Sequence, residues 1–154
     1  VFTSELKRAQ DTAKIILENL SQWEELNDKD KIVKNINLNE RDYGDLTGLN
    51  KQETAEKFGE EQVHKWRRGY SDQPPNGESL EDVVARVRSY FDEVIFKEIQ
   101  NNDNHNILIA AHGNSLRALL IVMNIYSPNE INSVELSTGV PIHVLFDNNQ
   151  FSIK

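Results

Sequence analysis

The segment from Ile107 to Leu120 holds residue types that could bind an anionic group. It opens with five apolar residues, which predict a short buried strand, and it ends in a helical pattern with Arg117 in its first turn. His112, Gly113 and Asn114 lie between them. In a parallel sheet this is the carboxyl end of a strand beside helix N–H groups, where anions bind. These residues suit a phosphate; an ordinary strand–turn–helix with a histidine in its turn is the alternative.

Four other residues could complete an anion site, and each also has a simpler explanation. Arg8 lies near the start of a predicted helix, where a solvated surface arginine is the common case. Glu40 lies in a charged, glycine-containing loop, and a carboxylate beside a phosphate can act as a general acid or base. The alternative for Glu40 is a surface ion pair. Arg67 and Arg68 end a short predicted helix, whose C-terminus cations also stabilise.

Composition restricts the class of protein. The chain has 154 residues, of which 38% are apolar and 27% charged, as expected for one globular domain. The net charge of −8 argues against nucleic acid as a partner, although clustered arginines can still attract a small anion. No apolar run approaches the length of a membrane span. The chain has no cysteine, which fits a cytoplasmic protein, and its histidines share no metal-ligand spacing, so we expect no metal.

The elements that must position these residues alternate between strands and helices, which predicts an α/β domain with a mainly parallel sheet. Helical spacing of apolar residues predicts helices after Ser4, after Asn50, over 60–68, from Ser79 to Ile99 and from Ser115 to about Asn124. The helix after Ser79 reads as a core element, and we assign it no chemistry. A short strand is expected around Val33, and two strands over 142–146 and 151–153 are expected to form a hairpin.

Four longer motifs point to a known family. They are ILIAAHGNSLRALL, LNERDYGDLTGLNKQETAEKFGEEQVHKWRRGY, LSTGVPIHVLFD and VFTSELKRAQDTA. Together they resemble the cofactor-dependent phosphoglycerate mutases of the histidine phosphatase superfamily, from Val1 to about Asp147. The resemblance implies a three-layer α/β/α fold. It also implies a cytoplasmic glycolytic enzyme that interconverts 2- and 3-phosphoglycerate through a phosphohistidine and a 2,3-bisphosphoglycerate intermediate, without a metal.

The resemblance also assigns a role to each candidate residue. It implies that His112 contacts the phosphoryl group, that Arg8 grips the transferring phosphate and that Glu40 exchanges a proton with the substrate hydroxyl. The residues implied to bind the substrate or the phosphoryl group are Tyr43, Lys51, Arg67, Arg68, Gly113 and Asn114. Arg41 and Arg117 belong to the same motifs, with direct contact less expected. The implied cofactor is 2,3-bisphosphoglycerate, and the implied partners are small phosphorylated three-carbon acids.

One family motif has no counterpart in the sequence. The family's nucleophile is a histidine in an Arg-His-Gly motif after the first strand, and no such tripeptide occurs here. We therefore expect residues 1–154 to form a single mutase-like domain that is N-terminally incomplete and lacks the first βα unit. Two alternatives stay open: a histidine-type phosphatase acting on another phosphoester, and an inactive anion-binding protein if these residues are the whole molecule. Family members are monomers, dimers or tetramers, so a homo-oligomer is among the implied states.

Overall fold

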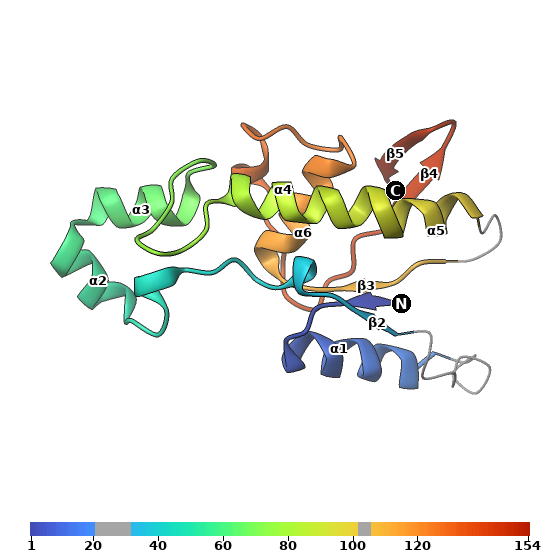
Figure 1. Ribbon diagram of the computed structural model, residues 1–154, viewed down its shortest axis with the longest axis horizontal. Coiled ribbons are helices and arrows are strands. Elements are labelled where there is room, and N and C mark those ends of the chain that lie inside the picture. Colours follow the sequence, from blue (N-terminus) through green and yellow to red (C-terminus); the bar gives the residue numbers. More distant parts are fainter. Residues whose placement is uncertain (21–31, 102–105) are drawn as a thin grey trace.

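The structure is a computed structural model that describes residues 1–20, 32–101 and 106–154, except for the side chain of Lys51. A parallel sheet lies between two layers of helices (Figure 1). Its strand order is β2 (Val33–Lys34), β1 (Phe2–Thr3), β3 (Ile109–Ala110). Helix α1 (Lys7–Glu18) lies on one side, and α4 (Leu80–Tyr90) and α6 (Gly113–Val122) lie on the other. This confirms the predicted α/β class.

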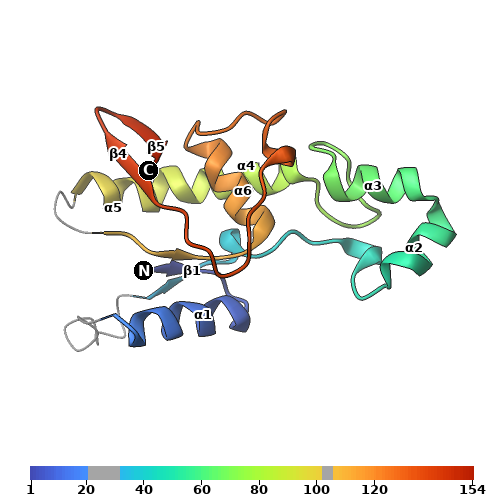
Figure 2. The same cartoon turned by 180° about the vertical axis from the view of Figure 1, so that it is seen from behind.

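The remaining elements extend the fold at both ends. Helices α2 (Lys51–Phe58) and α3 (Glu60–Arg68) lie at the end of the molecule away from the chain termini (Figure 1). The hairpin of β4 (Val144–Asp147) and β5 (Gln150–Ile153) lies near α5 (Phe96–Asn101) in both views (Figure 2). Phenylalanine rings join the hairpin to α5, since Phe96 lies 5.5 Å from Phe146 between ring centroids. The predicted hairpin is therefore confirmed.

Helix α4 is the central element of the core. It begins with a capping box, in which Ser79 Oγ accepts from the Asp82 N–H and the Asp82 carboxylate accepts from the Ser79 N–H. Val83 and Val87 are fully buried on the face that packs against α6. The predicted single helix from Ser79 to Ile99 instead passes through a π-helical turn at Phe91–Ile95 before α5. Apolar spacing does not reveal this change, because both ends of that turn are buried.

Two predicted helix starts differ from the structure. Leu6, not Ser4, occupies the N-cap position of α1 and makes no side-chain hydrogen bond there. The Ser4 hydroxyl accepts from the Leu6 N–H over 3.1 Å and also contacts His112. Helix α6 begins at Gly113, two residues before the predicted Ser115, so His112 is its N-cap. The candidate histidine therefore lies directly between β3 and the N-terminus of α6. None of the helices in the described ranges has the length and apolar content that crossing a membrane requires.

Candidate active site

His112 is buried at the carboxyl end of β3 and contacts two other side chains. Its Nδ1 accepts a hydrogen bond from Arg8 Nε over 3.2 Å, and its Nε2 lies 2.8 Å from Ser4 Oγ. A guanidinium can only donate, so Nδ1 is unprotonated and Nε2 carries the ring proton, which it donates to Ser4. Burial and then the charge of Arg8 lower the pKa of His112. The imidazole is therefore neutral at neutral pH.

The sheet brings these distant residues together. Thr3 pairs with Ala110 in the parallel register of β1 and β3, and Thr3 Oγ1 donates to the Ala110 carbonyl over 2.8 Å. The two strands therefore end side by side, and the residues that follow them meet at one edge. Ser4 and Arg8 approach His112 from the β1 side, although Arg8 and His112 lie 104 residues apart in the sequence.

Glu40 lies at the N-terminus of α6. Its Oε1 accepts hydrogen bonds from the Asn114 N–H over 3.2 Å and the Arg41 N–H over 2.8 Å. A carboxylate at this position is stabilised by the free N–H groups of the first helical turn. A Cβ at Gly113 would lie 3.9 Å from Glu40 Oε2, an ordinary contact, and 3.3 Å from Nη1 of Arg117, a closer one. The negative charge of Glu40 interacts electrostatically with both His112 and Arg117 and partly offsets the effect of burial, which lowers the pKa of each.

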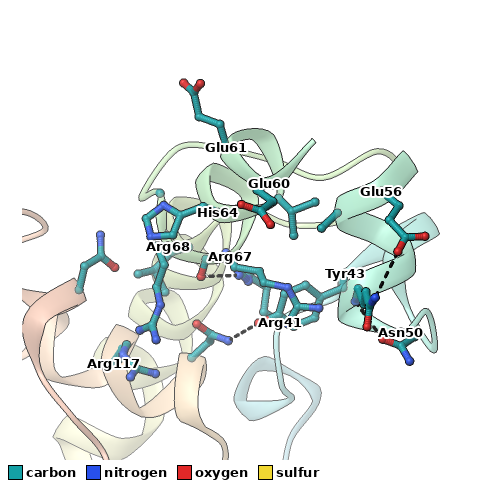
Figure 3. Close-up of a pocket in the computed structure, with 17 residues that line it drawn as sticks. Arg41, Tyr43, Asn50, Glu56, Glu60, Glu61, His64, Arg67, Arg68 and Arg117 are labelled. Carbon is teal, nitrogen blue, oxygen red and sulfur yellow. Dashed lines mark hydrogen bonds between the residues drawn. The ribbon is translucent and has the colours of Figure 1, made fainter. Parts of the chain in front are cut away.

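A pocket of about 1230 Å³ lies between the loop at Arg41, helices α2 and α3, and the start of α6 (Figure 3). Four arginines line it: Arg41, Arg67, Arg68 and Arg117. Tyr43 supports two of them, since the guanidinium carbons of Arg41 and Arg67 lie 4.6 and 5.9 Å from its ring centroid. The Tyr43 hydroxyl also accepts a hydrogen bond from Asn114 Nδ2 over 3.2 Å. The pocket wall also carries three glutamates: Glu56, Glu60 and Glu61.

The arginines of the pocket lie close enough for their positive charges to affect one another. Burial and then the like charge of Arg68 lower the pKa of the Arg117 guanidinium. The Nε atoms of Arg41 and Arg67 are buried and have no hydrogen-bond acceptor in the described part of the chain. A buried donor without an acceptor costs free energy, more so when it is charged. An anion bound in the pocket would add negative charge beside the four arginines that line it.

The structure brings most of the predicted site residues together. Arg8 contacts His112, Glu40 contacts the backbone of Asn114, and Arg67 and Arg68 line the arginine pocket. The other predicted residues also have definite places: Tyr43 and Asn114 line the pocket, Gly113 begins α6, and Lys51 begins α2 with its side chain outside the described part. No group of three or more His, Cys, Asp or Glu side chains in the described ranges could hold a metal ion.

Sequence reasoning missed or undervalued four residues. Arg41 and Arg117 line the pocket as fully as the predicted pair from α3. Ser4 holds Nε2 of His112, and Arg86 on α4 binds the loop that carries Glu40. The sequence signals for Ser4 and Arg86 were those of a helix cap and a helix-surface cation.

Comparison with known sequences shows the family of the chain. The chain matches the family described as "Histidine phosphatase superfamily (branch 1)" over residues 1–154. It is 50% identical over 141 residues to a 2,3-bisphosphoglycerate-dependent phosphoglycerate mutase of Methylocella silvestris, covering 92% of this chain and 65% of that protein. It is 52% identical to the protein of the same name in Bradyrhizobium sp. (strain ORS 278), with the same coverage. The chain thus spans about 65% of the length of these curated relatives.

Solved structures share the fold at lower identity. A mycobacterial glucosyl-3-phosphoglycerate phosphatase in complex with VO3 aligns with a TM-score of 0.79 and 21% identity, over 100% of this chain and 73% of that one. The alpha-ribazole phosphatase of Shigella flexneri aligns with a TM-score of 0.72 and 20% identity, over 99% and 70% of the two chains. The resemblance read from the sequence is confirmed: this chain belongs to the histidine phosphatase superfamily.

Proposed function

We propose that this chain supplies the substrate site of a 2,3-bisphosphoglycerate-dependent phosphoglycerate mutase, which interconverts 2- and 3-phosphoglycerate. The observation that carries the proposal is the arginine pocket, in which two buried guanidinium Nε–H groups have no acceptor among the described residues. Planar guanidinium groups suit phosphate and carboxylate, the two anionic groups of this substrate. Relatives at 46–52% identity carry the same activity in their names.

The site has two cationic parts, and we assign one end of the substrate to each. Arg8 and His112, with Gly113 and Asn114, hold the phosphoryl group that is transferred. The arginine pocket, with Tyr43 and Lys51, holds the group at the other end of the three-carbon acid. Bound 2,3-bisphosphoglycerate supplies the phosphoryl group that primes the cycle. We further propose that the enzyme is cytoplasmic, that these residues form a single domain of it and that it acts on small phosphorylated acids.

Glu40 is the candidate for a proton donor and acceptor in this site. Its carboxylate is at the α6 N-terminus and interacts electrostatically with both cationic parts. We therefore assign it proton exchange with the substrate hydroxyl during phosphoryl transfer. His112 receives no nucleophilic role, because Nδ1 accepts from Arg8 and Nε2 donates to Ser4. It stabilises the transferring group instead, and the nucleophile is assigned to none of the residues in this chain.

A second candidate is a phosphatase that acts on a larger phosphoester. The pocket volume of about 1230 Å³ exceeds the needs of a three-carbon acid, and its acidic wall offers acceptors for hydroxyl groups of a bulkier substrate. The structural neighbours named above are both phosphatases. This candidate predicts release of inorganic phosphate rather than isomerisation.

Turnover of the natural gene product that contains this sequence separates the two candidates. The assay follows conversion of 3-phosphoglycerate with and without 2,3-bisphosphoglycerate, and phosphate release from p-nitrophenyl phosphate in parallel. We expect conversion that depends on 2,3-bisphosphoglycerate and exceeds phosphate release. Phosphate release without conversion would contradict the mutase and support the phosphatase.

A further inference from the structure

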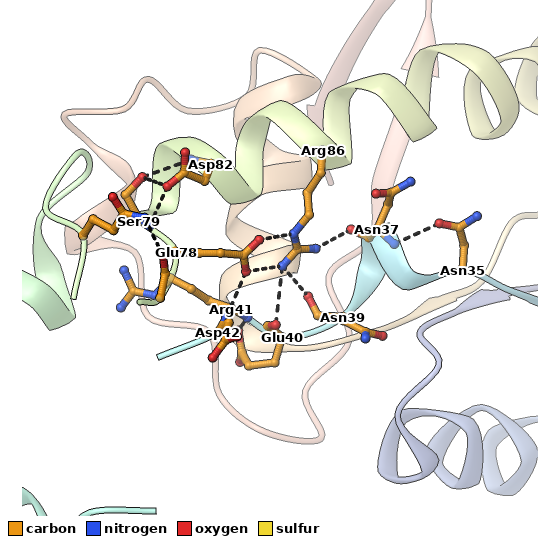
Figure 4. A network of polar contacts seen from close by, with 12 residues as sticks. Asn35, Asn37, Asn39, Glu40, Arg41, Asp42, Glu78, Ser79, Asp82 and Arg86 are labelled. Atoms are coloured by element: carbon orange, nitrogen blue, oxygen red, sulfur yellow. Dashed lines mark hydrogen bonds and ion pairs between the residues drawn. The ribbon is translucent and has the colours of Figure 1, made fainter. Parts of the chain in front are cut away.

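Arg86 binds the backbone of the segment that carries Glu40 (Figure 4). From the second turn of α4, its Nη1 donates to the Asn37 carbonyl over 2.7 Å, and its Nη2 donates to the Asn39 and Glu40 carbonyls over 3.1 and 3.4 Å. Three carbonyls within four residues thus have one guanidinium as their donor. Residues 39 to 43 adopt neither helix nor strand, so regular secondary structure does not fix this backbone.

Glu78 holds Arg86 in this position. Nε and Nη2 of Arg86 donate to the two oxygens of the Glu78 carboxylate over 2.8 and 3.0 Å, a bidentate pair. The carboxylate also accepts from the Asp42 N–H over 2.9 Å, so Glu78 binds the far side of the same loop. Burial raises the pKa of Glu78, but hydrogen bonds from Arg86 and Asp42 outweigh it, and the pKa lies below its ordinary value.

The backbone of Arg86 belongs to a helix that is anchored in the core. Helix α4 has a complete capping box, and the neighbouring Val83 and Val87 are fully buried. The Arg86 side chain itself is only 19% exposed. The hydrogen bonds of Arg86 and Glu78 therefore hold the backbone of residues 37–42 in a fixed place relative to the core helix α4.

We propose that Arg86, held by Glu78, is a positioning residue for Glu40. It does not touch the Glu40 carboxylate. It fixes the backbone on either side of the Glu40 Cα. The Glu40 carboxylate therefore keeps its hydrogen bonds from the N–H groups of Arg41 and Asn114. This inference rests on the proposed function only for the role of Glu40 in proton transfer; the geometric part is independent of it.

The test is a double-mutant cycle in the natural gene product. Arg86→Lys keeps the charge but cannot serve three carbonyls and a bidentate carboxylate at once. We expect kcat to fall by about tenfold or more while KM for 3-phosphoglycerate changes little, since one misplaced proton donor costs catalysis rather than binding. In a Glu40→Gln background the same substitution should change kcat hardly at all, because its effect passes through Glu40. Arg88→Lys, on an exposed position of α4, is the matched control.

A second readout does not depend on turnover. Amide hydrogen exchange at Arg41 and Asn114, the two donors to Glu40 Oε1, should be faster in the Arg86→Lys protein and unchanged in the Arg88→Lys control. If Arg86→Lys does not fold, Glu78→Gln replaces it, with a smaller effect in the same direction. Unchanged exchange, or equal loss of kcat with and without Glu40, would overturn the positioning role. Absence of mutase turnover in the wild type would contradict the proposed function alone, because the exchange measurement still reports on Arg86.

Discussion

The Nε–H of Arg8 donates to Nδ1 of His112 over 3.2 Å, so the imidazole is held as the neutral tautomer protonated at Nε2. The two residues come from segments that follow neighbouring strands of the parallel sheet. A positive guanidinium on the unprotonated nitrogen opposes protonation of the ring. This contact gives the site a cationic donor beside a neutral histidine rather than two cations.

The first prediction concerns the pH dependence of stability. Because burial and Arg8 lower the pKa of His112 in the folded protein, the unfolded chain binds its proton first as the pH falls below the ordinary value of 6.5. His112 should therefore make the folded state less stable as the pH drops through and below 6.5. Urea unfolding at neutral and mildly acidic pH tests this, and His112→Gln should lose part of the decrease. An NMR titration midpoint for His112 at or above 6.5 would contradict the account.

The second prediction concerns Arg8. Removing a donor aimed at developing phosphoryl charge costs about 10²–10³-fold in rate in comparable sites, and we expect a loss of this order for Arg8→Ala. In the Arg8→Ala protein the pKa of His112, measured by NMR titration, should also rise, because the positive charge that lowers it has been removed. The neighbouring Lys7 is exposed and paired with Asp11, so Lys7→Ala is the control. Equal rates for the two variants would remove Arg8 from the transfer step.

The third prediction separates binding from proton transfer. Glu40→Gln keeps the size of the side chain and an oxygen acceptor for the Asn114 N–H, so anion binding should persist. Loss of a general acid–base slows transfer by roughly 10²–10⁴-fold. Steady-state kinetics and direct binding of 3-phosphoglycerate measure the two effects, with Glu53→Gln on the exposed side of α2 as control. Normal turnover of the Glu40 variant would exclude the assigned role.

The fourth prediction concerns the loop behind Glu40. Gly44 has φ of +53° and its Cβ position would clash with the Pro75 carbonyl, whereas Gly48 has φ of +79° with nothing within 4 Å. Alanine at either position is strained by its positive φ, at about 1 kcal/mol or more, but only Gly44→Ala must also displace backbone. Denaturant unfolding should show the larger loss of stability for Gly44→Ala. A similar loss of stability for both variants would show that the loop at Gly44 is not closely packed against the loop at Pro75.

Local signals in the sequence predicted much of the fold. The spacing of Val63 and Trp66 placed α3 correctly, and the Ser79–Asp82 pair marked the start of α4, because both depend on residues a few positions apart. The strand before His112 was also expected from its apolar run. These features follow from hydrogen bonds and apolar contacts within one element, which the order of residue types records directly.

Contacts between distant segments were not predictable in the same way. Ser4 followed by Glu5 fits a helix cap, yet strand pairing carries Ser4 to His112, 108 residues away. Arg86 resembles any polar position on an amphipathic helix, and its acceptors are backbone carbonyls, which no residue type marks. Arg41 in the loop and Arg117 on α6 line one pocket although 76 positions separate them in the sequence.

Calorimetric binding of 3-phosphoglycerate to the natural gene product tests the central claim, that the arginine pocket holds one end of the substrate. We expect one site per chain. A hydrogen bond to a charged group contributes about 1.5–3 kcal/mol, so Arg67→Ala and Arg68→Ala should each weaken binding by about tenfold or more. The exposed Arg88→Ala control should bind like the wild type. Equal affinity in all three variants, or no binding to the wild type, would contradict the account.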